Sequence, residues 1–471
     1  MVIRARSSSC WAEPPRRPSR TAAFPCCWRT SVVETGSPPR RNARLSNAAF
    51  VDRLDIVLRP DPSRVVIRPY VPGSDDDHAR ARRIASRVMA LDDATVADEL
   101  CDLTRDFAGH HAEVEAVFAQ RYAEVKGVIG HDDPIGEERI LLIGAYFCQE
   151  YGYEAAALFN PSIVAHPDQT RIPAGSVRFV LSLRAVGEGH VSSITFRTGV
   201  CDASGGIALE PQGARAIVPR IEDAALGGSR PAGVRMQCEP GYALSEIVIF
   251  PSTPAQRNGI EDLRLVRFAD DDGTVSWLGT YTAYSGQGIR QELLRTNDFC
   301  SFALDTIHGA AGAGKGMALF PRRIAGRYAM LGRADNETIS LAYSDDLYDW
   351  PLGTTIIEPR WPWEFVQIGN CGSPIEVAEG WLVLTHGVGP MRNYAIGACL
   401  LDRDDPSKLL GRLTRPLVRP DTTERKGYVP NVTYSCGALL HGRTLVLPYA
   451  VADSFTTFAT MPIDRLIAAM R

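Results

Sequence analysis

Two neighbouring carboxylates and a guanidinium follow a turn near the middle of the chain, where Glu261, Asp262 and Arg264 come after Asn258 and Gly259. An apolar, strand-like run follows them. Because adjacent side chains of a strand face opposite sides, Asp262 and Arg264 are expected on one face and Glu261 on the other. An acid beside a guanidinium at a strand entrance suits a catalytic acid with a charged neighbour, and it also suits an ordinary strand-end ion pair. These residues alone leave both interpretations open.

The composition is that of a globular protein, with 471 residues, 45% hydrophobic and 23% charged. This length allows a large core or two to three domains. A net charge of -4 gives no signal for nucleic-acid binding, and no run of 18 apolar residues predicts a membrane span. The 11 cysteines form no C-x-x-C pair. We therefore expect reduced thiols, a cytoplasmic location and no structural zinc.

The first part of the chain has a composition of its own. Residues 1–45 hold nine arginines and two acids among many prolines and serines, so they lack the apolar surface to offset the entropy of ordering. We expect residues 1–48 to be a disordered extension, with a transit-like peptide as the alternative. Residues 52–70 are expected to form an extended arm of one or two strands.

Helical spacing of apolar residues appears between residues 75 and 151. Ile84 and Val88 are one such pair, and longer periodic stretches cover 114–128 and 135–150. We predict about four helices, so that residues 49–152 form an arm plus a helical region, which could mediate homo-oligomer formation or act as a lid. His110 and His111 suit either a metal site or, as the more common case, a solvated helix end.

Short apolar runs separated by Gly, Pro, Asn and Asp replace this helical pattern from Leu158 onward. Many short strands at fairly even spacing, over some 300 residues, favour a sandwich, barrel or propeller. Their number is too large for one sandwich, and loosely repeated units favour a propeller. The end of the chain, around residues 462–470, is expected to form a short closing helix.

Several motifs occur in a recognisable order along this β-rich part. They lie at residues 158–161, 182–184, 259–264, 315–321, 330–333, 380–388, 402–408, 429–432 and 452–454. Together they resemble glycoside hydrolase family 130, the β-mannoside phosphorylases and inverting β-mannosidases. Leu263 stands where the family usually has proline. The resemblance covers about residues 158–465 and implies a mainly β fold, with a five-bladed β-propeller over residues 153–471 preceded by the N-terminal α-helical region.

The resemblance implies that Asp262 is the general acid, which protonates the departing glycosidic oxygen of a manno-oligosaccharide while phosphate or water attacks with inversion. Residues at matching positions are then expected to bind phosphate or the sugar. The expected phosphate ligands are Lys315, Arg333 and His386. The expected substrate ligands are Asn160, Arg184, Glu188, His190, Arg264 and Asp453. Glu188 and His190 also suit a plain hairpin turn, Arg333 an ion pair with Asp335, and His386 a core position.

Phosphate differs from water in needing cations rather than a second carboxylate as base. None of Lys315, Arg333 and His386 is acidic, although Gln367 stands where phosphorylases often have lysine. We therefore expect phosphorolysis that releases α-mannose 1-phosphate, with a hydrolytic β-mannosidase or a non-catalytic carbohydrate-binding propeller as alternatives. Inorganic phosphate is the co-substrate, and no cofactor or metal is implied.

A glycine-rich stretch at residues 309–316 superficially resembles a nucleotide-binding P-loop. Its lysine, Lys315, is followed by Gly316 rather than Ser or Thr, and no strand and helix flank the loop. We therefore do not expect nucleotide binding. The backbone amides of this loop remain suited to a small anion.

Overall fold

The computed structural model describes residues 50–72, 78–111, 113–130, 134–222, 233–421, 425 and 427–470. The chain divides into two units, Met1–Leu45 and Ser46–Arg471, and all described residues belong to the second. The extension predicted for residues 1–48 lies outside the described residues.

The arm contains two strands, β1 (Asp52–Leu58) and β2 (Val65–Pro69). Four helices follow it, as predicted: α1 (Ala79–Met89), α2 (Asp93–Phe107), α3 (Val114–Ile129) and α4 (Glu137–Tyr146). Helices α3 and α4 meet closely at Gly144, where an added Cβ would lie 1.9 Å from the carbonyl oxygen of Phe118. The longest described helix, α3, has 16 residues, and no helix in the described ranges is long and apolar enough to cross a membrane.

The prediction that the last helix runs to residue 150 was wrong. Helix α4 ends at Tyr146, and strand β3 (Cys148–Gly152) pairs antiparallel with β2. Tyr151 explains the change, because its buried ring packs edge-on against Phe250 with 5.6 Å between ring centroids. This contact with the β-rich part outweighs the local helical periodicity.

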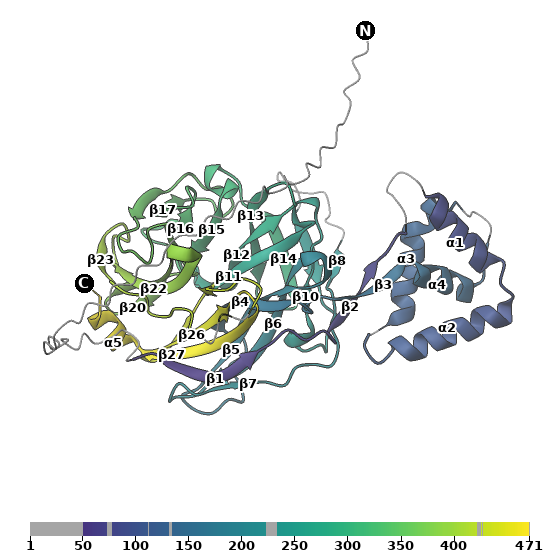
Figure 1. The fold of residues 1–471 in the computed structure, drawn as a ribbon, viewed down its shortest axis with the longest axis horizontal. Helices are drawn as coiled ribbons and strands as arrows, with labels where there is room; N and C mark the ends of the chain where they lie inside the picture. Colours follow the sequence, from purple (N-terminus) through teal and green to yellow (C-terminus); the bar gives the residue numbers. More distant parts are fainter. Residues whose placement is uncertain are drawn as a thin grey trace, which may run out of the picture. The chain divides into compact units, whose positions relative to one another are not determined.

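The β-rich part begins with two groups of antiparallel strands that join into one 11-stranded sheet (Figure 1). The first group comprises β4 (Ala157–Ala165), β5 (Val177–Val186) and β6 (Ser192–Cys201), with short β7 (Ile207–Leu209) and β10 (Val248–Ile249) along β6. The second comprises β11 (Gly259–Ala269), β12 (Val275–Tyr284), β13 (Ile289–Thr296), β14 (Ser301–Thr306), β9 (Val234–Gln237) and β8 (Arg220–Glu222). One parallel pair, Gly259 with Ser192, connects the two groups.

Three further antiparallel sheets follow in chain order. The first of them holds β15 (Lys315–Leu319), β16 (Tyr328–Arg333), β17 (Ile339–Ser344) and β18 (Thr354–Ile357). The next holds β19 (Gln367–Asn370), β20 (Ile375–Val377), β21 (Gly380–Gly389), β22 (Asn393–Leu401) and β23 (Leu409–Arg412). The last holds β24 (Thr433–Tyr434), β25 (Leu439–His441), β26 (Thr444–Val451), β27 (Phe455–Pro462) and β1. The predicted closing helix is α5 (Ile463–Ala468).

The first strand of the chain completes this last sheet. Strand β1 pairs with β27, from Asp52 opposite Thr460 to Leu58 opposite Thr456, and Figure 1 shows the purple β1 alongside the yellow β27. Arg64, on the same arm, donates hydrogen bonds to the Tyr153 hydroxyl at 2.7 Å and to the Ser245 carbonyl at 2.7 Å. The arm is therefore part of the β-rich core.

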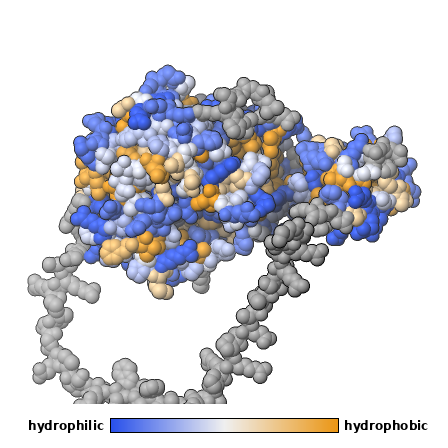
Figure 2. Space-filling view, turned by 90° about the horizontal axis from the view of Figure 1, so that it is seen from above, coloured by the Kyte–Doolittle hydropathy of each residue, from blue (hydrophilic) through white to orange (hydrophobic). Residues whose placement is uncertain are grey.

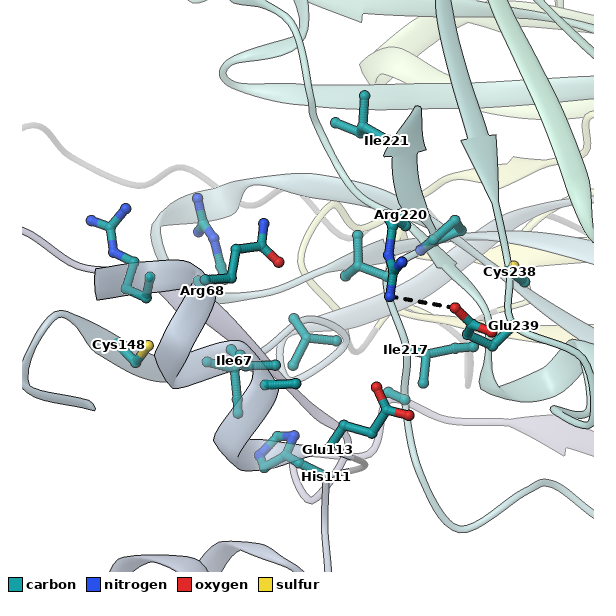
Figure 3. A pocket seen from close by; sticks show the side chains of 18 of the residues that line it. Ile67, Arg68, His111, Glu113, Cys148, Ile217, Arg220, Ile221, Cys238 and Glu239 are labelled. Atoms are coloured by element: carbon teal, nitrogen blue, oxygen red, sulfur yellow. Dashed lines mark ion pairs between the residues drawn. The ribbon is translucent and has the colours of Figure 1, made fainter. Parts of the chain in front are cut away.

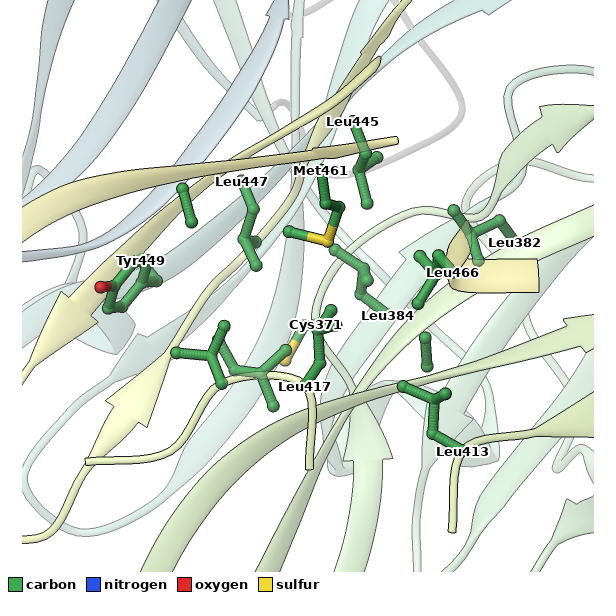
Figure 4. Close-up of a cluster of buried hydrophobic side chains, with 14 of the residues drawn as sticks. Cys371, Leu382, Leu384, Leu413, Leu417, Leu445, Leu447, Tyr449, Met461 and Leu466 are labelled. Carbon is green, nitrogen blue, oxygen red and sulfur yellow. The ribbon is translucent and has the colours of Figure 1, made fainter. Parts of the chain in front are cut away.

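Apolar side chains fill the space between neighbouring sheets. The cluster in Figure 4 joins the sheet of β21 and β22 to that of β26 and β27, with α5 contributing Leu466. Its members include Leu382, Leu384, Leu445 and Leu447, which alternate along their strands as one buried face requires. The face of the molecule in Figure 2 is mostly polar, with scattered hydrophobic patches.

Candidate active site

Strand pairing explains how residues far apart in sequence reach one site. In an antiparallel pair, the start of one strand lies beside the end of the next. The register places Phe159, next to Asn160, opposite Arg184, Lys315 opposite Arg333, and Gly369 opposite His386. The predicted site residues thus lie at the same kind of position in successive groups of strands.

Asp262 is held by two side chains from the neighbouring group of strands. Asn160 donates a hydrogen bond to Asp262 Oδ1 at 2.7 Å, and Arg184 NH1 lies 3.3 Å from the same oxygen. Asp262 Oδ2 has no hydrogen-bond partner among the described residues. The Asp262 side chain keeps 22% of its surface exposed, so a ligand can reach part of it.

The expectation that Glu261 faces away from Asp262 was wrong. Asp262 has a φ of 57°, and the pairing of β11 with β12 shifts register between Glu261 and Arg264. This irregularity breaks the alternation of side chains, since a left-handed residue within a strand turns its neighbours. Arg184 consequently bridges both acids, with its NH2 2.6 Å from Glu261 Oε1.

Opposing effects determine the pKa of Asp262. Burial alone would raise it, but the positive charges of Arg184 and Arg264 and the hydrogen bond from Asn160 outweigh burial and hold the pKa below its ordinary value. For Glu261, burial dominates and raises the pKa despite Arg184.

Asp453 joins the same acidic cluster from the turn between β26 and β27. Burial, together with the nearby charge of Asp262, raises the pKa of Asp453 to about 6, although Arg184 and Arg392 oppose the shift. Its φ of 49° places it in the left-handed region, as in Asn160 and Asp262. Three carboxylates, Glu261, Asp262 and Asp453, therefore surround one arginine, Arg184.

The cationic residues form a second cluster at the ends of β15, β16 and β21. Arg333 is 7% exposed, and its Nε has no hydrogen-bond partner in the part of the chain that the structure describes. Neither Arg333 nor the exposed Lys315 forms a salt bridge within the described ranges. Asp335, the alternative partner of Arg333, instead accepts hydrogen bonds from the backbone of Glu337 and from Thr338.

His386, one of the expected phosphate ligands, is neutral in this cluster. Its Nε2 lies 2.7 Å from Arg333 NH1, and because a guanidinium only donates, Nε2 must accept. Burial, with the charges of Arg333 and Arg264, lowers the pKa of His386 well below its ordinary value. His386 therefore orients Arg333 and contributes no charge of its own.

A glycine leaves room between two guanidinium groups. A Cβ at Gly316 would lie 3.9 Å from Arg333 Nε and 4.0 Å from an NH2 of Arg264, and the φ of 83° disfavours any side chain there. The preceding residues form a short 3-10 turn, Ala310–Ala313, and Lys315 begins strand β15 rather than a helix. Arg264, Arg333 and Gly316 together form a cradle suited to an anion.

Arg264 lies deeper than expected. It is 2% exposed, donates to the carbonyl oxygen of Asp262 at 3.3 Å, and donates to the hydroxyl of Tyr434 at 2.8 Å. Sequence reasoning did not single out Tyr434, which ends the short strand β24. A polar aromatic two residues after the motif at 429–432 was the available signal.

The remaining predicted residues lie outside these contacts. Glu188 is exposed, its charge acts on Arg68 and Tyr151, and its backbone oxygen accepts from the Tyr151 hydroxyl at 2.7 Å. His190 is also exposed, and its ring lies 5.4 Å from that of Tyr428. Their part in substrate binding stays a prediction.

The two histidines of the helical region differ in their surroundings. His111 is buried, with its Nε2 2.6 Å from Glu150 Oε1, so it is not a solvated helix end. Within the described ranges, no group of three or more His, Cys, Asp or Glu side chains is placed to hold a metal.

A cavity of about 550 Å³ is lined by residues of β2, α3, β8 and β9 (Figure 3). None of the predicted site residues lines it. Several of its charged side chains are paired with each other, including Arg220 with Glu239 at 3.4 Å and Arg121 with Glu124 at 2.8 Å. These ion pairs and the absence of every predicted site residue set this cavity apart from the candidate active site.

Comparison with known proteins identifies the family to which the chain belongs. The sequence model of a family described as beta-1,4-mannooligosaccharide phosphorylase matches residues 138–471. A match over most of the chain defines its class as the glycoside hydrolases and their related phosphorylases. Within that class, the chain belongs to glycoside hydrolase family 130.

Individual relatives are more distant. The chain is 38% identical over 142 residues to a 1,2-beta-oligomannan phosphorylase of Thermoanaerobacter sp. (strain X514), covering 30% of this chain and 48% of that protein. It is 30% identical over 227 residues to a beta-1,2-mannobiose phosphorylase of Listeria innocua, covering 46% and 62%. The matches thus span about half to under two thirds of these relatives. A structure of the Listeria innocua beta-1,2-mannobiose phosphorylase with beta-1,2-mannobiose aligns with a TM-score of 0.49 at 21% identity, covering 67% of this chain and 92% of that one.

Proposed function

We propose that the chain is a phosphorylase of β-mannosides, which transfers a mannosyl group from a manno-oligosaccharide to inorganic phosphate. The observation that carries the proposal is the cationic cluster, in which neither Arg333 nor Lys315 forms a salt bridge within the described residues and Arg333 Nε has no hydrogen-bond partner there. Buried or part-buried cations that lack a salt-bridge partner favour a bound anion. The family and the names of its relatives, several of them β-mannoside phosphorylases, support the same conclusion.

Asp262 would be the general acid of this reaction. Its Oδ2 protonates the departing glycosidic oxygen, while a phosphate oxygen attacks the anomeric carbon from the opposite side. The C1–O glycosidic bond breaks, a C1–O–P bond forms, and inversion gives α-mannose 1-phosphate. Asn160, Arg184 and Asp453 would bind hydroxyls of the transferred mannose.

The low pKa of Asp262 in the free site is compatible with this role. A bound phosphate would offset the positive field of Arg264, and a bound sugar would displace water from around the carboxyl. Both changes favour the protonated acid. The acid would therefore gain its proton as the substrates bind.

Several features of the whole protein belong to the same proposal. The successive antiparallel groups are interpreted as the blades of a five-bladed β-propeller, over residues 153–471. The arm and helical region would occupy residues 49–152, with a homo-oligomer formed through the helices. The cytoplasmic location and the lack of a cofactor stay predictions.

Product analysis tests the proposal against hydrolysis, which needs a second carboxylate as base. The purified chain is incubated with β-1,2- and β-1,4-linked manno-oligosaccharides, with and without inorganic phosphate. We expect mannose 1-phosphate only when phosphate is present. Free mannose formed at the same rate without phosphate would contradict the proposal, and binding without turnover would favour a non-catalytic carbohydrate-binding protein.

A further inference from the structure

The Tyr434 hydroxyl has a proton with no acceptor. Arg264 NH2 donates to this oxygen at 2.8 Å, so the hydroxyl accepts that bond and its own hydrogen must point elsewhere. Within the described ranges no acceptor for it is in place. Tyr434 is 8% exposed, and leaving a buried hydroxyl proton unpaired destabilises the free site. A ligand that accepts this hydrogen bond would remove that cost.

The surroundings of Tyr434 indicate where such a ligand would lie. Its ring centroid is 4.9 Å from that of His386, the residue that orients Arg333. The charges of Arg264, Asp262 and Arg333 all act on its hydroxyl. Tyr434 therefore contacts Arg264 and His386 and lies within electrostatic range of both Asp262 and Arg333.

The chemistry of the hydroxyl suits an anion. Burial raises the pKa of Tyr434, so the phenol stays neutral and protonated over the whole working pH range. Arg264 donating to its oxygen withdraws electron density and strengthens the O–H as a donor, as in any chain of hydrogen bonds. A neutral phenol of this kind can donate a hydrogen bond to an anionic oxygen without changing the net charge of the site.

We propose that the Tyr434 hydroxyl donates a hydrogen bond to the inorganic phosphate and fixes the orientation of its attacking oxygen. This inference rests on the proposed function, because it assumes that phosphate enters the cradle of Arg264, Arg333 and Gly316. Arg264 then has a positioning role, because its hydrogen bond to the hydroxyl of Tyr434 holds and polarises the phenol. Tyr434 thereby becomes a specificity residue for phosphate over water.

Tyr434→Phe tests the inference, with Tyr153→Phe as a matched control. Tyr153 is also a buried tyrosine whose hydroxyl accepts from an arginine, Arg64, at 2.7 Å, but it lies in the core near the arm. Michaelis constants for phosphate and for the mannoside are measured separately, along with Tm. We expect Tyr434→Phe to raise KM for phosphate about tenfold and to leave KM for the mannoside within about twofold.

The Tyr153→Phe control distinguishes a hydroxyl that binds phosphate from one that only stabilises the fold. Both variants are expected to lower Tm, and Tyr153→Phe should leave both Michaelis constants unchanged. An unchanged KM for phosphate in Tyr434→Phe, or an equal rise in both constants, would overturn the inference. If wild type shows neither phosphate-dependent turnover nor a Tm increase with phosphate, the proposed function fails, and the inference fails with it.

A second measurement covers the case in which Tyr434→Phe does not fold. 3-Fluorotyrosine placed at position 434 alone reports on the phenol through its ¹⁹F resonance. Inorganic phosphate should shift that resonance and mannose alone should not. If phosphate raises the Tm of the labelled protein but does not shift the ¹⁹F resonance, the inference is overturned while the proposed function stands.

Discussion

The two halves of the candidate site treat charge in opposite ways. In the acidic half, Glu261 and Asp262 form ion pairs with one arginine, Arg184, at 2.6 and 3.3 Å. In the cationic half, Arg333 donates a hydrogen bond to a neutral histidine, and no carboxylate in the described ranges pairs with it. A buried charge without a partner is costly, so a protein retains one where a ligand supplies the partner.

This difference in charge pairing indicates a different chemical role for each half of the site. In the acidic half, Arg184 pairs with Glu261 and with Oδ1 of Asp262, which leaves Asp262 Oδ2 without a hydrogen-bond partner among the described residues and suits an acid that acts through one oxygen. The cationic half is incomplete, which suits a site that binds an anion only during the reaction. Asp262 and Arg333 can be altered separately, because they lie on different strands, β11 and β16.

Asp262→Asn should have the largest effect. It removes the transferable proton while keeping a similar shape, so kcat for mannoside cleavage should fall about 10²–10⁴-fold. Formation of mannose 1-phosphate measures this loss. Asp270→Asn is the matched control, because Asp270 follows the other end of β11 and pairs with Arg323 at 2.7 Å. Turnover that survives Asp262→Asn would contradict the acid assignment.

Arg333→Gln should have the next largest effect, and it should change KM for phosphate and not KM for the mannoside. The loss of a charge-assisted contact is expected to raise KM for phosphate about 10- to 100-fold, with KM for the mannoside nearly unchanged. Steady-state kinetics with each substrate varied in turn measures the difference. Arg327→Gln serves as the control, since Arg327 precedes β16 at its opposite end and pairs with Asp345. Equal effects on both substrates would show that the two halves are not separable.

Asp453→Asn should have the smallest effect, and it concerns stability. The pKa of Asp453 is raised from 3.8 to about 6, so the folded protein holds this proton more tightly than the unfolded chain does. Stability therefore falls as pH rises from about 4 to 6, and the penalty persists above pH 6. Removing the charge should raise the free energy of unfolding at pH 7.5 by about 1–2 kcal/mol, and not at pH 4.

Thermal unfolding at the two pH values measures this gain. Asp464→Asn is the control of opposite sign, because a hydrogen bond from Arg443 lowers the pKa of Asp464. That variant should gain nothing at pH 7.5. A gain for Asp453→Asn that is equal at both pH values would mean that the charge of Asp453 is not the cause.

Sequence periodicity predicted the elements well where local pattern and tertiary packing agree. The arm strands, the four helices and the closing helix are present, and the β-rich part follows from short apolar runs. Helix α4 ended early because Tyr151 packs against Phe250, a contact that no local pattern reveals. Tertiary contacts of this kind decide the ends of elements.

The sequence was enough to predict which residues belong to the site, but not how they contact one another. Motif order singled out Asp262, Arg184, Arg333 and His386, and strand pairing brings their neighbours together. The shared pairing of Glu261 and Asp262 could not be predicted, because it depends on the left-handed φ at Asp262. The neutral state of His386 depends on Arg333 as a donor, and Tyr434 emerged only from its bond to Arg264.

The pairing of β1 with β27 has a consequence for biosynthesis. Thr457, on β27, donates a hydrogen bond to the backbone of Leu54, 403 positions earlier in the chain. At a ribosomal rate of 5–20 residues per second, β1 waits roughly 20–80 s for its partner. Throughout that time it is an open strand edge, which invites pairing with other nascent chains. Expression yield should therefore depend on chaperone supply more than the stability of the finished protein would suggest.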